Sequence, residues 1–137
     1  MNSENDAVKY FVVNVLGCRC PEEVFHEIRL NRAPAPVDDV PLLFDIRVGG
    51  RLLIWGVAAG ELQGRASPLA ALAAAGARTR DDNGFNRFRL VVVSNGADGP
   101  APDKSLEALP EHDGRIHLHV VDKRDVEGFM DLICNGL

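Results

Sequence analysis

The spacing of apolar residues divides the first third of the chain into three segments. Residues 9–16 (KYFVVNVL) are rich in β-branched and aromatic residues, which predicts a buried strand. Residues 20–30 (CPEEVFHEIRL) have a proline and two glutamates directly after Cys20, a composition typical of a first helical turn, and predict a helix. The prolines and aspartates of residues 31–41 predict an irregular loop.

Residues 42–59 (LLFDIRVGGRLLIWGVAA) carry the clearest local signal, two strand-like runs around a Gly-Gly pair. Glycine readily adopts the positive φ angles of a two-residue hairpin turn. A turn at residues 49–50 would place Ile46 opposite Leu53 and Phe44 opposite Trp55. These four side chains would then form one apolar face, with the polar residues of the hairpin on the other.

The second half of the chain alternates between helical and extended patterns. We expect a helix at 68–80, a strand at 87–95, a long connection at 96–114, a strand at 115–122, and a helix from Asp122 or Asp125 to about Cys134. The connection is unusually long for a compact domain, and such loops are often functional or mobile.

The predicted order of elements is β-α-β-β-α-β, followed by the long loop and a final β-α pair. We therefore expect one α+β domain over residues 1–137, with a flexible N-terminal tail at 1–8. The first six elements match a two-layer sandwich with a ferredoxin-like βαββαβ core, to which the last strand and helix are additions.

A second possible architecture comes from a family resemblance. The stretch DDVPLLFDIRVGGRLLIWGV resembles the second half of thioredoxin-like proteins, with Val40-Pro41 at the position of their cis-proline. A cysteine motif between a strand and a helix is also similar to that family, although CxC stands here in place of CxxC. The resemblance implies a mixed α/β, thioredoxin-like fold and thiol chemistry.

Composition and charge narrow the classes of partner. The chain is 46% hydrophobic and 26% charged, as in ordinary globular proteins, and its formal net charge is −5. A net negative charge gives no general attraction to nucleic acid or to an anionic membrane surface. The sequence shows neither the pattern of a signal peptide nor an apolar run of roughly 18 residues. We expect a cytoplasmic protein that binds neither nucleic acid nor membranes.

Cys18 and Cys20 lie one residue apart, where the apolar run 9–16 gives way to the predicted helix. Two thiols at this spacing in a turn can reach the roughly 4.4–6.8 Å Cα separation of a disulfide, which would be strained and easily reduced. Cys20 would also lie at a helix N-terminus, where the dipole favours a thiolate. The same pair could instead bind a soft metal ion, or be two inert small residues at a turn.

Two histidines form the other candidate set. His117 and His119 alternate with apolar residues in IHLHVV, so both point to the same face of the predicted strand. They could complete a metal site with Cys18 or Cys20, or simply lie on the surface of the sheet. Cys134 falls on the apolar side of the last helix, where an inert buried thiol is expected.

The sequence favours thiol-disulfide redox activity, with Cys20 as the nucleophile and Cys18 as the resolving thiol. One alternative is a non-catalytic module for protein interaction or assembly. Another is binding of zinc or copper by the same pair, as ferredoxin-like metallochaperones do with a different cysteine spacing. The redox hypothesis needs no cofactor. An open sheet edge favours a homodimer or an unidentified protein partner.

Overall fold

The structure is a computed structural model that describes residues 8–15, 27–31, 34–37, 39–62, 68–94 and 116–134. Its elements are, in chain order, the π-helical segment η1 (Phe11–Val15), β1 (Ile28–Asn31), β2 (Phe44–Val48), β3 (Leu52–Ala58), the 3-10 helix η3 (Ala59–Leu62), α2 (Pro68–Asn83), β4 (Arg87–Ser94), β5 (Ile116–Asp122) and α4 (Lys123–Cys134). No helix in these ranges is long and apolar enough to cross a membrane.

Five strands in the described ranges form one mixed sheet, in the order β1-β2-β3-β4-β5. The first three pair antiparallel, and β3, β4 and β5 run parallel. Because α2 joins β3 to β4, it provides the crossover that a parallel pair requires. The mixed α/β class, which was the alternative to the expected α+β two-layer sandwich, is therefore correct. A split βαβ core would separate strands that are consecutive in sequence, so the ferredoxin-like arrangement is not confirmed.

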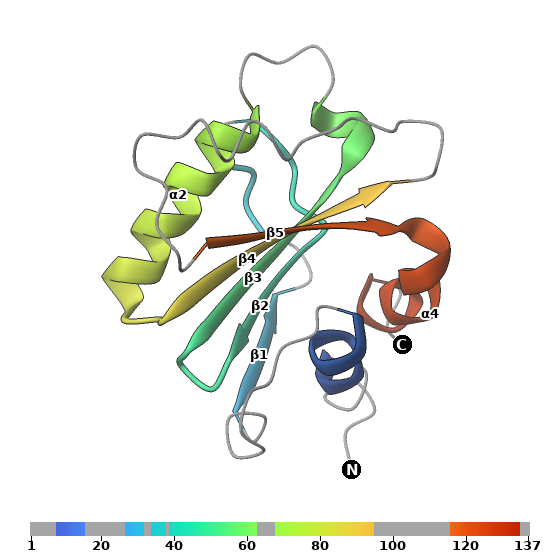
Figure 1. Ribbon diagram of the computed structural model, residues 1–137, viewed down its shortest axis with the longest axis horizontal. Coiled ribbons are helices and arrows are strands. Elements are labelled where there is room, and N and C mark those ends of the chain that lie inside the picture. The colour runs from blue at the N-terminus through green and yellow to red at the C-terminus, as the bar shows by residue number, and fades with distance from the viewer. Residues whose placement is uncertain are drawn as a thin grey trace.

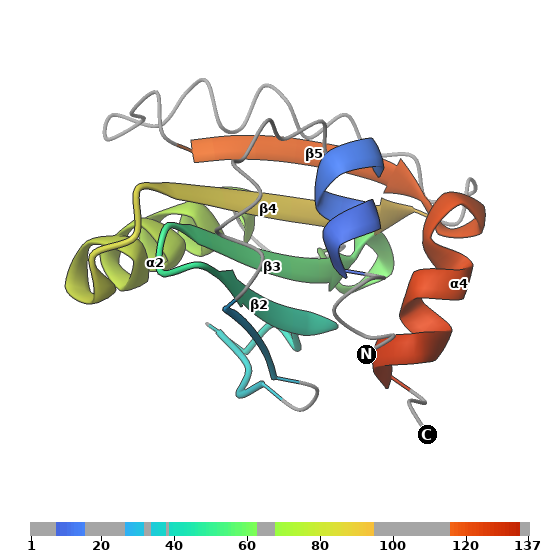
Figure 2. The ribbon, with the colours of Figure 1, turned by 90° about the horizontal axis from the view of Figure 1, so that it is seen from below.

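Helical segments cover both faces of the sheet and give it three layers (Figures 1 and 2). One apolar core joins Val8, Phe11, Val12 and Val126 to Phe44, Ile46, Val48, Leu52, Ile54, Val91 and Val93 of the sheet. The opposite core joins Leu72 and Ala73 of α2 to residues that include Leu53, Trp55, Phe88 and Leu90. We call the first the η1/α4 face and the second the α2 face.

The prediction of a strand at residues 9–16 was wrong, because residues 8–15 are helical. Val8, Phe11 and Val12 are fully buried at spacings of three and four residues, while Tyr10 and Val13 are exposed. This is the period of a helix that buries one side. Phe11 stacks on Phe129 of α4, with 4.3 Å between the ring centroids.

Residues 28–30, at the end of the helix predicted at 20–30, are not helical. Residues 28–31 form the strand β1, in which half-buried and exposed side chains alternate with a period of two. Residues 20–26 lie outside the described ranges. A strand therefore occupies the end of the segment in which a helix was expected.

The hairpin of β2 and β3 was correctly predicted, but its register is shifted by one residue. The pairs are Phe44 with Gly56, Ile46 with Ile54 and Val48 with Leu52, so the turn has three residues. Since side chains alternate, the shift moves every β3 side chain to the opposite face relative to β2.

The remaining elements agree with the sequence pattern. The helices α2 and α4 and the strands β4 and β5 lie where they were expected, and α2 runs three residues further, to Asn83. Asp122 accepts a hydrogen bond from the backbone N–H of Arg124 at 2.8 Å and thus caps α4. The bond before Pro41 is trans, unlike the cis-proline of the thioredoxin-like family.

Candidate functional site

Of the three cysteines, only Cys134 lies within the described residues. Cys18 and Cys20 lie outside these ranges, as do His26, His112 and the connection 96–114. Cys134 is the last residue of α4. Redox or metal chemistry at Cys18 and Cys20 therefore stays a prediction.

The two histidines of β5 do share a face of the sheet, as predicted. The parallel register pairs Arg89 with His117 and Val91 with His119, which places both imidazoles on the η1/α4 face. Arg87 and Arg89 of β4 point to this same face, because they lie four and two residues before Val91, which is part of the core on that face. We call Arg87, Arg89, His117 and His119 the Arg/His cluster.

Each arginine of the cluster is hydrogen-bonded to one histidine of the neighbouring strand. Nη1 of Arg89 lies 2.7 Å from Nε2 of His119, and Nη1 of Arg87 lies 3.0 Å from Nε2 of His117. A guanidinium has only donors, so it donates and the histidine Nε2 accepts. Both imidazoles are therefore neutral in this arrangement, with the ring proton on Nδ1.

Burial and the neighbouring positive charges reinforce that protonation state. Burial, then the charge of Arg89, then His117 lower the pKa of His119 to about 4. Burial, followed by the charge of Arg87, also lowers the pKa of Arg89. His119 is consequently neutral at pH 7, and the two arginines supply the positive charge of the cluster.

Within the described ranges, no carboxylate lies within ion-pair distance of Arg87 or Arg89. Nε of Arg89 is buried and has no hydrogen-bond partner there. A guanidinium carries five N–H donors, and each of these two uses one of them on a histidine. Among the described residues, these two guanidinium groups thus have no neutralising carboxylate and keep several unused donors on a partly desolvated surface, a combination that attracts anions.

Comparison with known proteins gives no family. No family model matches the chain, and no curated protein or solved structure is similar enough to it to show kinship. The function must therefore be argued from the arrangement of its own residues.

The geometry disfavours a metal ion on the histidines. A metal at both Nε2 atoms would have to displace two arginine hydrogen bonds and would stand beside two guanidinium charges. The described residues also contain no group of three side chains of the types that hold a metal. Participation of His117 and His119 in a metal site with Cys18 or Cys20 would require a different arrangement of the cluster.

Sequence reasoning did not single out Arg87 and Arg89, although a signal is present. The segments RFRLVVV and IHLHVV share the same alternation, with charged or ionisable residues at every second position before a β-branched run. If the two strands pair in parallel with these runs aligned, the four side chains fall on one face. The missing information was that these strands are neighbours.

Proposed function

We propose that this protein is a binding module and that the Arg/His cluster binds an anionic group, a phosphate or a carboxylate, of its partner. The observation that carries the proposal is that Arg87 and Arg89 share one face with only neutral histidines as hydrogen-bond partners among the described residues. This proposal follows the alternative of a non-catalytic module for interaction or assembly and not the redox activity that the sequence favours.

Because the Arg/His cluster is partly buried, the proposed anion would be a specific ligand and not an accidental counter-ion. Desolvation lowers the pKa of Arg89, which means that the folded protein holds this charge in an environment unfavourable to it. An anion bound to its free N–H groups would form charge-assisted hydrogen bonds and offset that cost. The histidines contribute by fixing the orientation of both guanidinium groups.

The chain as a whole repels anions, since its formal net charge is −5. Binding at the cluster must therefore depend on close contact and directed hydrogen bonds. Long-range attraction cannot be its main source. We expect selectivity for compact anions that can accept several hydrogen bonds at once.

The test is an NMR titration of the imidazole signals with inorganic phosphate, repeated with citrate as the carboxylate probe, at low ionic strength and pH 7. We expect saturable shifts of the His117 and His119 signals. Arg87→Gln removes an exposed charge and should weaken binding at least tenfold without affecting the core. Arg89→Gln should do the same.

Arg78→Gln is the matched control, because Arg78 is an exposed arginine of α2, on the opposite side of the sheet. Its binding should be unchanged. Preference for phosphate or for citrate would identify the kind of anion. Imidazole signals that respond to neither probe, or that respond equally in the Arg87→Gln variant, would refute the proposal.

A further inference from the structure

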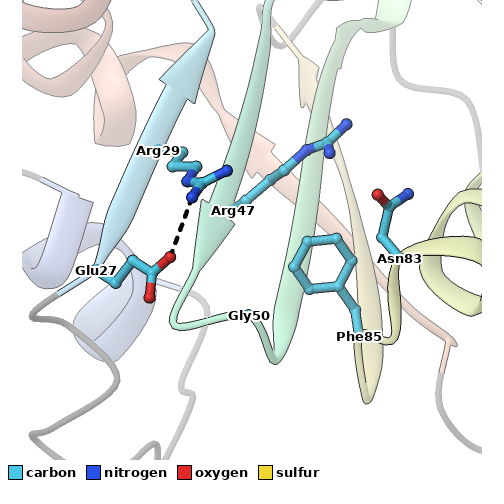
Figure 3. Close-up of a pocket in the computed structure, with 6 residues that line it drawn as sticks. All are labelled: Glu27, Arg29, Arg47, Gly50, Asn83 and Phe85. Atoms are coloured by element: carbon cyan, nitrogen blue, oxygen red, sulfur yellow. Dashed lines mark hydrogen bonds and ion pairs between the residues drawn. The ribbon is translucent and has the colours of Figure 1, made fainter.

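A small pocket opens on the α2 face, at the hairpin end of the sheet (Figure 3). It has a volume of about 180 Å³ and is lined by Glu27, Arg29, Arg47, Gly50, Asn83 and Phe85. Pockets for drug-sized ligands have volumes of roughly 300–1,000 Å³, so a ligand of this pocket would have to be smaller than a typical drug. The Arg/His cluster is on the other face of the sheet, which makes this pocket an independent site.

Two arginines of the pocket stand directly opposite each other on neighbouring strands. Arg29 and Arg47 are register partners of β1 and β2, and like charges in such positions are destabilising. Each has a carboxylate two residues before it, Glu27 or Asp45, but the closest N–O distances are 3.4 Å. Charge-assisted hydrogen bonds are usually about 2.7–2.9 Å long. A carboxylate placed between the two guanidiniums would relieve their repulsion.

The guanidinium of Arg47 has two neighbours that favour its position before any ligand arrives. Its Nε and Nη2 each lie 3.4 Å from an oxygen of Asp45, whose side chain is only 11% exposed. On another side, its Cζ lies 5.8 Å from the centre of the Phe85 ring, within the range of a cation–π contact. Phe85 is itself buried and so provides a fixed apolar wall for the pocket.

The pocket also offers hydrogen-bond acceptors. Nδ2 of Asn83 donates to the backbone oxygen of Thr79 at 2.8 Å, which fixes the amide and leaves Oδ1 as an acceptor. Glu27, in the same lining, carries a negative charge that Arg29 neutralises only at 3.4 Å. Figure 3 shows Arg29 and Arg47 on the sheet, with Asn83 and Phe85 coming from the end of α2 and the loop after it. The pocket thus combines two cations, an anion, an amide acceptor and an aromatic ring.

We propose that this pocket binds a free α-amino acid as its zwitterion. The carboxylate would bind between Arg29 and Arg47, and the ammonium group would donate to Oδ1 of Asn83, on the side of Arg47 away from Glu27 (Figure 3). The ligand side chain would pack on Phe85. A dicarboxylate is disfavoured by Glu27, and a simple amine is disfavoured by the two arginines.

The test is ligand-observed NMR with L-phenylalanine and L-alanine, compared with 3-phenylpropionate and phenethylamine, which lack the ammonium and the carboxylate respectively. We expect at least one of the two amino acids to bind saturably, and both truncated ligands to bind at least tenfold more weakly than the amino acid that binds more tightly, or not at all. Arg47→Gln should weaken amino-acid binding at least tenfold. Arg29→Gln should weaken it as well without affecting folding, because that side chain is 77% exposed.

Lys123→Gln removes the same charge from the exposed start of α4 and should leave binding unchanged. Failure of both amino acids to bind saturably would overturn the proposal. So would equal binding of L-phenylalanine and 3-phenylpropionate, or affinity that Arg29→Gln leaves intact. None of these results bears on the Arg/His cluster, since that site is tested with different probes and different variants.

Discussion

Replacing Gly56 with alanine tests how closely β2 and β3 pack in the register described above. A Cβ added at Gly56 would point into the ring of Phe44, with Cε1 only 2.7 Å away. Carbon atoms in ordinary contact are about 3.5–4.0 Å apart, so one of the two groups must move. The Phe44 ring has little freedom, because Phe11 and Phe129 pack against it edge-on, at centroid distances of 5.9 and 5.6 Å.

The expected cost follows from this confinement. Overpacking a well-filled core costs about 1–3 kcal/mol, and the better strand conformation of alanine offsets roughly 0.5–1 kcal/mol of it. We expect Gly56→Ala to lower the free energy of unfolding by about 1–2 kcal/mol. For a domain of this size that corresponds to a fall in Tm of roughly 4 °C per kcal/mol.

The assay is urea unfolding followed by the fluorescence of Trp55, the single tryptophan of the chain and 4% exposed, with circular dichroism as a second probe. The same substitution is then made in a Phe44→Leu background, where the smaller side chain leaves room for the new methyl group. There Gly56→Ala should cost less than about 0.5 kcal/mol. An equal cost in both backgrounds would show that Phe44 does not lie over Gly56, and the register would be wrong.

Two further predictions concern stability. Because the pKa of His119 falls to about 4 on folding, the unfolded chain binds more protons between pH 6.5 and 4. Stability should therefore fall by about 1 kcal/mol, after allowance for solvent, as the pH is lowered through this window, and the fall should be smaller by that amount in His119→Gln when urea unfolding is repeated across the pH range. Gly76→Ala in α2 should lower Tm, because its Cβ would meet the ring of Phe88. Gly128→Ala in α4 has open space and should raise stability by up to about 1 kcal/mol, so calorimetry showing the same sign for both would contradict the packing described.

The hairpin shows why an element can be predicted correctly while its register is not. Both faces of β3 are buried, so its side chains from Leu52 to Val57 are apolar on either side and fix no preferred face. The register depends on whether Arg51 belongs to the turn. In the structure it does, because the N–H of Arg51 donates to the carbonyl oxygen of Val48. A single turn residue therefore decides the face to which Asp45 and Arg47 belong.

The strand predicted for the N-terminal segment 9–16 was wrong for a different reason. Its β-branched residues favour a strand by propensity, but its burial follows a helical period set by packing against the sheet and α4. Tertiary contacts that local sequence does not reveal decided the outcome. The same limit applies to the Arg/His cluster, which exists only because β4 and β5 pair in parallel.

The stacked rings of Phe11 and Phe129 also bear on the order in which the molecule can fold. These residues lie near opposite ends of the sequence, and both pack on the face that contains Phe44 and Ile54. On the ribosome, the sheet hairpin and α2 emerge well before α4, so the α2 face can close early while the opposite face waits for the last helix. During that interval its apolar residues would be available to chaperones or to neighbouring chains. Completion of this layer, and not formation of the sheet, would then be the late step of synthesis-coupled folding.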